Sequence, residues 1–383
     1  MDKVRVGITQ GDINGVGYEV IMKALAEDGV PELFTPVIFG HKSIAQKAID
    51  TFGLSTLRLN VINNLDEIND DKINLFELET APPQLKPGEV DKEAGDAAVA
   101  SLEKAVEALN SGDIDVVVTA PISKEAVQSE RFNFPGHTEF FSHRLSEEDN
   151  RHEAMMILCN EDLRVALLTK HVPLSQIPEA ITREGIIEAV EKFSATLKQD
   201  FGVVRPSVAV LSLNPHAGDG GLLGSEEEEI IKPALASLME KGYIAMGPFP
   251  ADGFFGHGAY KKFDGVLAMY HDQGLAPFKT IAYNGGVNYS ASLPFVRTSP
   301  DHGTAYDIAW QGKADPSSMR DAIYMAIDIF RRRKSFMEAS ANPLKKHVHE
   351  RPEKSERFDK GPHRSEHNKD IHNREIPNRE IDD

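Results

Sequence analysis

Residues 208–235 read VAVLSLNPHAGDGGLLGSEEEEIIKPAL, and this stretch contains the pattern that decides the fold. An apolar run of strand length, 208–213, leads into a glycine-rich loop and then into a segment that we interpret as a helix, 225–240. Consecutive apolar residues are typical of a strand that helices cover on both faces, as in a parallel sheet. The stretch therefore predicts one strand–loop–helix unit of an α/β fold.

The same alternation recurs along the chain. Further apolar runs of strand length lie at 4–8, 36–39, 57–62, 116–119, 155–158, 165–169 and 265–270. Segments 96–110 and 317–333 have the spacing of amphipathic helices. Alternating strands and helices predict an α/β protein with a largely parallel sheet.

The composition limits the classes of function. A chain of 383 residues with 40% hydrophobic and 27% charged residues suggests a globular protein of two domains. The formal net charge is −18, and residues 343–383 contain ten basic and ten acidic residues, so the excess lies in 1–342. An acidic body argues against non-specific binding to nucleic acid and to anionic membranes. A bound phosphate would therefore need a local cluster of donors.

The single cysteine, Cys159, lies in an apolar run, where we expect a buried and inert thiol. One cysteine excludes an intramolecular disulfide, which favours the cytoplasm. The N-terminal MDKVRVGITQGD predicts a strand rather than a signal peptide, and no run of 18 apolar residues occurs.

Three histidines follow predicted strands: His171 in LLTKHVP, His216 in LSLNPHAGDGG and His271 in LAMYHDQG. The carboxyl ends of parallel strands share one edge of a sheet, where ligands gather. Three imidazoles at that edge would form a divalent-metal site with open positions for substrate. The alternative is that each is a hydrogen-bonded loop residue.

The region after the third histidine is rich in hydrogen-bond donors and acceptors. They are Lys279, Asn288, Arg297, Thr298, Asp301, His302 and Thr304. Arginine and lysine together suit a phosphate or carboxylate, so we interpret this region as functional. A weaker anion site is His137 and Thr138 in NFPGHTEFF, for which the start of a capped helix is an equally good interpretation.

Two glycine-rich loops resemble phosphate loops in position only. Gly11, Gly15 and Gly17 have neither the dinucleotide nor the P-loop spacing, so we expect a tight turn, with Asp12 and Asn14 free to face a cleft. Residues 218–224 miss the dinucleotide spacing by one residue, and the acidic run 226–229 would repel a pyrophosphate there. A nucleotide would therefore bind without the usual fingerprint.

Residues 343–383 have dense alternating charge and few apolar residues, so we expect a disordered tail. Its five histidines leave a metal-collecting role as an alternative.

Several motifs together resemble the 4-hydroxythreonine-4-phosphate dehydrogenase family of vitamin B6 synthesis. They are GITQGDINGVGYE, VTAPISKEA, FPGHTEFF, LLTKHVPL, LNPHAGDGGLLGSEE, GPFPADGFF, AMYHDQGLAPFK and SLPFVRTSPDHGTAYDIA, in the family's order over about residues 3–330. The first motif departs from the family's usual GDPAGIGPE, since Ile13 and Tyr18 replace two prolines.

The resemblance implies a homodimer of subunits with two α/β/α domains flanking a cleft, of the isocitrate/isopropylmalate dehydrogenase type. The first domain would comprise 1–133 and about 305–342, and the second, 134–304, would contain the metal and substrate residues. A divalent metal (Zn, Mg or Co) would bind His171, His216 and His271 at an interface that draws ligands from both subunits. Substrate would contact His137, Thr138, Lys279, Asn288 and Arg297. NAD or NADP would bind without a standard fingerprint.

The activity implied is oxidation of 4-phosphooxy-L-threonine at C3, followed by decarboxylation. Asp272, next to His271, is a candidate orienting group or proton acceptor, or a structural residue. One alternative is a dehydrogenase of 4-phospho-D-erythronate or D-threonate. The other is a non-catalytic metal- or nucleotide-binding protein.

Overall fold

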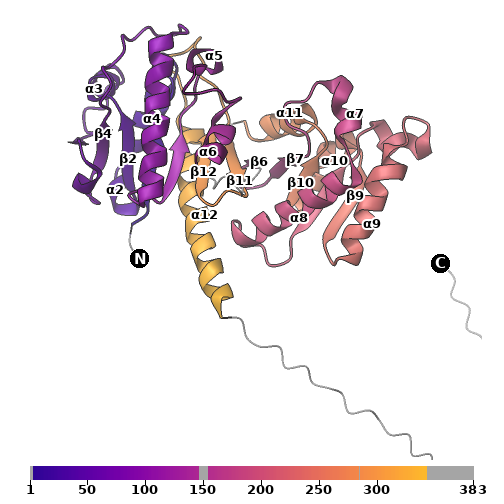
Figure 1. The fold of residues 1–383 in the computed structure, drawn as a ribbon. Helices are drawn as coiled ribbons and strands as arrows, with labels where there is room; N and C mark the ends of the chain where they lie inside the picture. Colours follow the sequence, from indigo (N-terminus) through magenta and orange to yellow (C-terminus); the bar gives the residue numbers. More distant parts are fainter. Residues whose placement is uncertain (1–2, 146–153, 284, 343–383) are drawn as a thin grey trace, which may run out of the picture. The chain divides into compact units, whose positions relative to one another are not determined.

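A computed structural model describes residues 3–145, 154–283 and 285–342 (Figure 1). Their core is one sheet with the strand order β3-β4-β2-β1-β5-β12-β11-β6-β7-β10-β8-β9. The strands are β1 (Arg5–Thr9), β2 (Thr35–Gly40), β3 (Leu59–Ile62), β4 (Ile73–Glu77), β5 (Val116–Thr119), β6 (Met155–Cys159), β7 (Arg164–Leu167), β8 (Ser207–Leu211), β9 (Ile244–Phe249), β10 (Gly265–Ala268), β11 (Val287–Ala291) and β12 (Val296–Pro300).

The sheet consists of two parallel blocks that run in opposite directions. Strands β3, β4, β2, β1, β5 and β12 form one block, and β7, β10, β8 and β9 form the other. Between them lie β11 and β6, which are antiparallel to each other, and each is antiparallel to the block strand beside it. The carboxyl ends of the two blocks therefore lie at opposite edges of the sheet.

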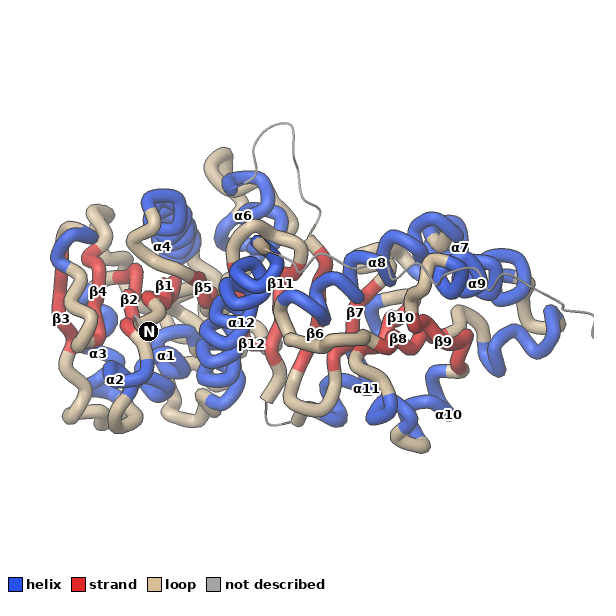
Figure 2. Tube along the Cα trace, turned by 90° about the horizontal axis from the view of Figure 1, so that it is seen from below, coloured by secondary structure: helices blue, strands red, loops and turns tan. Residues whose placement is uncertain are grey.

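Helices cover both faces of this sheet (Figure 2). They are α1 (Gly17–Leu25), α2 (Val30–Leu33), α3 (Lys42–Thr51), α4 (Lys92–Ser111), α5 (Lys124–Val127), α6 (His137–Leu145), α7 (Ile177–Ala180), α8 (Arg183–Gln199), α9 (Lys232–Glu240), α10 (Ala251–Gly256), α11 (His271–Ile281) and α12 (Ser317–Ala341). Local residues define both ends of α4, which is second in length to α12. Asp91 caps its N-terminus by accepting hydrogen bonds from two backbone N–H groups, and Gly112 ends the helix in a left-handed conformation.

The two faces are covered differently. Helices α1, α3, α8, α9 and α12 pack on one face along the whole sheet. On the other face, α4 and α6 pack on the first block and α10 and α11 on the second. The central strands β12, β11 and β6 lie between these two helix groups.

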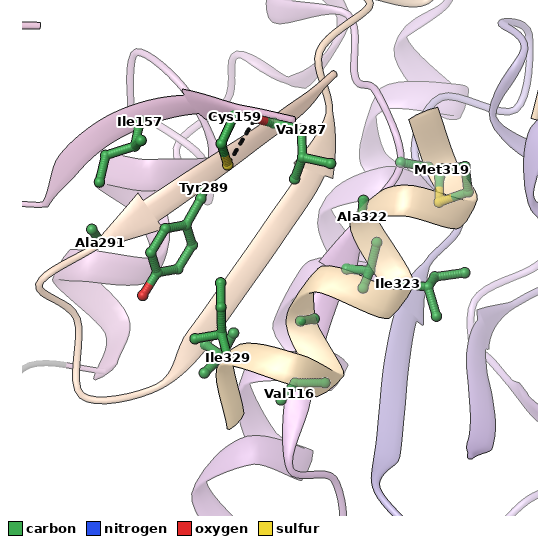
Figure 3. Close-up of a cluster of buried hydrophobic side chains, with 14 of the residues drawn as sticks. Val116, Ile157, Cys159, Val287, Tyr289, Ala291, Met319, Ala322, Ile323 and Ile329 are labelled. Atoms are coloured by element: carbon green, nitrogen blue, oxygen red, sulfur yellow. Dashed lines mark hydrogen bonds between the residues drawn. The ribbon is translucent and has the colours of Figure 1, made fainter. Parts of the chain in front are cut away.

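Of the central strands, β11 and β12 have one apolar and one polar face, whereas both faces of β6 are apolar. Ile157, Cys159, Val287 and Tyr289 belong to the same core cluster as the buried residues of α12 (Figure 3). Because side chains alternate along a strand, the residues between them point to the opposite face. Those residues include Asn288 and Ser290 of β11 and Arg297 and Ser299 of β12.

The predicted α/β class is confirmed, and all eight predicted strands occur. Segments 96–110 and 317–333 lie within α4 and α12, and 225–240 is helical from a π-helical turn, η4 (Glu227–Ile231), into α9. Strands β4, β9, β11 and β12 were not predicted. The division into two domains stays a prediction, and the predicted disorder of 343–383 falls outside the described residues. No helix in the described ranges is long and apolar enough to cross a membrane.

Candidate active site

A cavity of about 590 Å³ lies over the faces of β6, β11 and β12 that point away from the core beside α12. Leu158, Asn288 and Ser299 form one row of its floor, because Asn288 pairs with both of the other two across the strands. Helices α6 and α11 contribute its walls, together with the residues that follow β5, β7 and β12. The cavity thus occupies the place where the helix cover of this face is interrupted.

Arg297 of β12 is buried in the cavity floor with 2% of its surface exposed. Its guanidinium donates to Thr119 Oγ1 at 2.6 Å and to Ser290 Oγ at 3.0 Å. Among the described residues no carboxylate forms an ion pair with it, and burial lowers the pKa of Arg297 to about 10. A buried cation with only neutral partners suits an anionic ligand.

The first turn of α6 brings two predicted substrate residues to the same place. Thr138 Oγ1 lies 3.0 Å from Ser290 Oγ, so Thr138 and Arg297 share one hydroxyl partner. His137 begins the helix, and its Nε2 is buried without a partner among the described residues. Burial, and then the nearby cations Arg297 and Lys124, hold the pKa of His137 well below its ordinary value. The imidazole is therefore neutral near pH 7.

Two of the three predicted metal ligands meet at one end of the cavity. His171 follows β7 and His271 begins α11, and their ring centroids lie 5.9 Å apart. Burial lowers the pKa of His171, with Lys124 as the next cause, so the neutral form that a metal requires is favoured. His271 Nδ1 lies 2.7 Å from Asp272 Oδ1, a contact that orients the ring.

His216 does not join this pair within one chain. It follows β8, whereas His171 follows β7 and His271 follows β10. Strand β10 is parallel to both β7 and β8, so the three histidines do follow strands that end at one edge of the sheet. However, His216 is exposed, does not line the cavity and has a left-handed φ of 54°. No cluster of three possible metal-binding side chains occurs among the described residues. The assignment of His216 as a ligand stays a prediction.

The loop that carries His216 is built around Glu227. This carboxylate is fully buried and accepts from the backbone N–H groups of Leu213 and Asn214 at 2.8 and 2.7 Å. At Gly218, with φ 77°, an added Cβ would lie 2.7 Å from Glu227 Oε2. Gly218 and Glu227 thus stabilise the conformation of this loop. Glu227 binds backbone N–H groups of the loop rather than those at the start of a helix.

The first glycine loop is a tight turn, as predicted. A Cβ on Gly11 would lie 2.5 Å from the carbonyl oxygen of Pro121, and φ there is 66°. Asp12 and Asn14 do not face a cleft, because both are buried. Asp12 accepts a hydrogen bond from Tyr306 Oη at 2.6 Å, and Asn14 donates one to the carbonyl of Glu89.

The sequence profile of the pyridoxal phosphate biosynthetic protein PdxA family matches residues 32–326. A 4-hydroxythreonine-4-phosphate dehydrogenase of Bacteroides thetaiotaomicron is 50% identical over 360 residues, which is 93% of this chain and 97% of that one. The chain belongs to the PdxA family.

A PdxA relative from Cutibacterium acnes with the provisional name D-threonate 4-phosphate dehydrogenase is 39% identical over 85% of this chain and 94% of its own. The crystal structure of 4-hydroxythreonine-4-phosphate dehydrogenase from Klebsiella pneumoniae matches with a TM-score of 0.72 at 36% identity, over 86% of this chain and 98% of that one.

In this PdxA-family chain, most of the sequence-predicted site residues line the one cavity. They are His137, Thr138, His171, His271, Asp272, Lys279, Asn288 and Arg297. Asp301 and His302, which belong to the region interpreted as functional, also line it, whereas sequence reasoning assigned no role to Thr119, Lys124, Glu139 and Lys170. Glu139 could have been predicted, because it directly follows Thr138 in the helix start that we interpreted as an anion site. Thr298, in contrast, points to the core and donates to the Ala322 carbonyl.

Proposed function

We propose that this chain is an NAD(P)-dependent dehydrogenase of 4-phosphooxy-L-threonine in pyridoxal 5'-phosphate biosynthesis. The product is 2-amino-3-oxo-4-phosphooxybutanoate, which loses CO2 to give 3-amino-2-oxopropyl phosphate. The observation that carries the proposal is the buried guanidinium of Arg297, which has only hydroxyl partners among the described residues and lies in a cavity with two facing imidazoles. Membership of the PdxA family and the names of its relatives support the same activity.

Cations at two places suit a substrate with two anionic groups. Arg297 is buried in the floor, whereas Lys279 of α11 is exposed at the rim and donates to the carbonyl of Asp301 at 3.3 Å. Charge-assisted hydrogen bonds from such groups to phosphate or carboxylate would orient the substrate across the cavity. Thr138 and neutral His137 add a hydroxyl and an imidazole beside Arg297.

A divalent ion is the group that the imidazole pair suits best. Metal–nitrogen bonds are about 2.1 Å long, and two imidazoles on one ion have centroids within about 6 Å of each other, which agrees with 5.9 Å between His171 and His271. A bound ion would polarise the C3 hydroxyl and later the new ketone as a Lewis acid. We propose His216 as the third ligand, from a second copy of the chain in a homodimer, because His216 is exposed and separate from the other two.

Removal of the proton from the C3 hydroxyl needs an acceptor near the imidazole pair. Asp272 is our candidate, because its carboxylate contacts His271 and is 84% exposed, so it can pass a proton to water. The contact is equally compatible with a purely orienting role.

The test is turnover by purified, metal-analysed protein with NAD and, separately, NADP. We expect oxidation of 4-phosphooxy-L-threonine with release of CO2. Turnover only of D-threonate 4-phosphate or 4-phospho-D-erythronate would instead support the alternative function, which the relatives with the provisional D-threonate name favour. Fractionation of cells should recover the activity in the cytoplasm.

His216→Ala tests the shared metal site. We expect bound divalent metal to be lost and turnover to fall by at least about a hundred-fold, because metal ligands act as a set. The control is His257→Ala, another exposed histidine that does not line the cavity. Full turnover of His216→Ala would revive the non-catalytic interpretation of the histidines.

A further inference from the structure

A series of hydrogen bonds joins the floor of the cavity to its wall through a residue that does not line it. Arg297 Nη1 donates to Ser290 Oγ at 3.0 Å, and Ser290 Oγ lies 3.0 Å from Thr138 Oγ1. Arg297 and Thr138 line the cavity, whereas Ser290 is fully buried and does not. Any effect of Ser290 on a ligand must therefore pass through one of its two neighbours.

The hydroxyl proton of Ser290 has one acceptor within reach. A guanidinium only donates, so the oxygen of Ser290 accepts from Arg297. Among the described residues, Thr138 Oγ1 is the only other hydrogen-bond partner of Ser290 Oγ. If Thr138 donated to Ser290, the proton of Ser290 would be buried without an acceptor, which is rare in folded proteins. Ser290 therefore donates to Thr138.

The hydroxyl proton of Thr138 is then available to the cavity. Its oxygen accepts from Ser290, and no other hydrogen bond of this hydroxyl occurs among the described residues. Because Thr138 lines the cavity, its own proton is free to donate to a ligand there. An anionic oxygen is the acceptor that forms the strongest hydrogen bond with such a donor. The fixed charge of Arg297 thus determines the direction of both bonds in the series.

We propose that Ser290 is a positioning residue, which holds the hydroxyl of Thr138 as a donor to an anionic oxygen of the substrate. The proposal rests on the proposed function, because that substrate carries a phosphate and a carboxylate. It requires that Ser290 influences substrate binding without contacting the substrate, and only while residue 138 has a hydroxyl group.

A double-mutant cycle in KM and kcat tests the proposal. Ser290→Ala should raise the KM for the phosphorylated substrate by about ten-fold, since a hydrogen bond to a charged group is lost, and should change kcat by less than about three-fold. Thr138→Val, which removes the hydroxyl and keeps the branched side chain, should raise KM by a similar factor. In the Thr138→Val background, Ser290→Ala should change KM by less than about two-fold, because the donor that Ser290 positions is already absent.

The matched control is Ser101→Ala. Ser101 is as deeply buried as Ser290 and accepts from the backbone N–H of Gln10, but it does not line the cavity or contact a residue that does. Its KM should equal that of the wild-type enzyme. An equal rise in KM from Ser290→Ala in both backgrounds would overturn the proposal, because Ser290 would then act through Arg297 or the strand. A Ser290→Ala KM within about two-fold of wild type would overturn it as well.

A readout without turnover separates this inference from the proposed function. Inorganic phosphate or acetate should raise the melting temperature of the wild-type protein more than that of Ser290→Ala, and the anion that shows this difference identifies the group that Thr138 binds. Equal shifts in both proteins for both anions would contradict the proposal. If the wild-type enzyme oxidises only a sugar-acid phosphate, the proposed substrate is wrong, but the cycle assayed with that substrate still decides the role of Ser290. Ser290→Cys, whose thiol is a weak donor, replaces the alanine variant if that variant does not fold.

Discussion

The two faces of β11 and β12 have different roles: one packs in the hydrophobic core and the other lines the cavity. One face presents Val287, Tyr289 and Val296 to α12 and is closed by apolar packing. The other presents Asn288 and Arg297 to a cavity. Since adjacent residues of a strand point in opposite directions, a core and a candidate site can be separated by the thickness of one strand. Stability and activity should therefore respond to different residues of the same strands.

The largest difference between the effect on activity and the effect on stability is expected at Arg297. Arg297→Met should lower kcat/KM by at least about a hundred-fold, because a desolvated charge contact to the substrate is lost. The free energy of unfolding should be unchanged or higher, since a buried charge without a carboxylate partner is removed. Steady-state kinetics and thermal denaturation check both parts. The matched control is Arg164→Met, a half-buried arginine outside the cavity, which should keep its activity.

The opposite effect is expected on the apolar face. Ile323 of α12 is 2% exposed and belongs to the core cluster that also contains the apolar face of β11 (Figure 3). Ile323→Ala should reduce the free energy of unfolding by about 2–5 kcal/mol through lost burial and a residual cavity. At a temperature where the variant is folded, kcat/KM should stay within about three-fold of wild type. A selective loss of activity without loss of stability would show that the faces are coupled.

A smaller effect concerns pH at the polar face. Burial holds the pKa of His137 well below 6.5 in the folded protein, so the unfolded chain takes up this proton first as pH falls. Stability should therefore decrease below about pH 6.5, by at most about 1.4 kcal/mol per pH unit from this group. In His137→Gln this part of the decrease should be absent. Denaturant unfolding of both proteins from about pH 7.5 to 5.5 measures the difference, with exposed His143→Gln on the same helix as the control.

The smallest effect is expected from removing residues 343–383. Every residue that we place on either face lies before 343, so turnover and thermal stability should change by less than about two-fold and a few degrees, respectively. Kinetics and sedimentation of the truncated protein provide the measurement. A large fall in turnover at unchanged dimerisation would place the tail in the site.

The strands that could be predicted differ in pattern from those that could not. Val116–Thr119 and Val208–Leu211 are apolar at almost every position because helices cover both of their faces. In β11 polar and apolar residues alternate, as VNYSA, because one face lines the cavity. In β12, VRTSP, three polar residues follow one another, because Thr298 on the core face donates to a carbonyl of α12. A period of two was thus present only in β11, and the donors in both segments favoured a loop. The edge strand β9 is half-exposed and lacks a continuous apolar run.

The candidate site divides in the same way. His171 and His271 follow neighbouring parallel strands and do meet, as the shared strand edge predicted. His216 also follows a strand of this block, but a left-handed stretch of loop holds it apart, and local periodicity contains no information on loop conformation.

The sequence by itself determined the α/β class, eight strands, the family and many of the polar residues of the cavity, because each depends on local periodicity or on motifs. Only the tertiary structure decided that two parallel blocks run in opposite directions and meet at β11 and β6. That arrangement leaves a gap in the helix cover over three strands, and it brings Arg297, His137 and His302 from separate segments to one cavity. Strand pairing of this kind is long-range, and its energy depends on packing between residues far apart in the chain, so no local pattern specifies it.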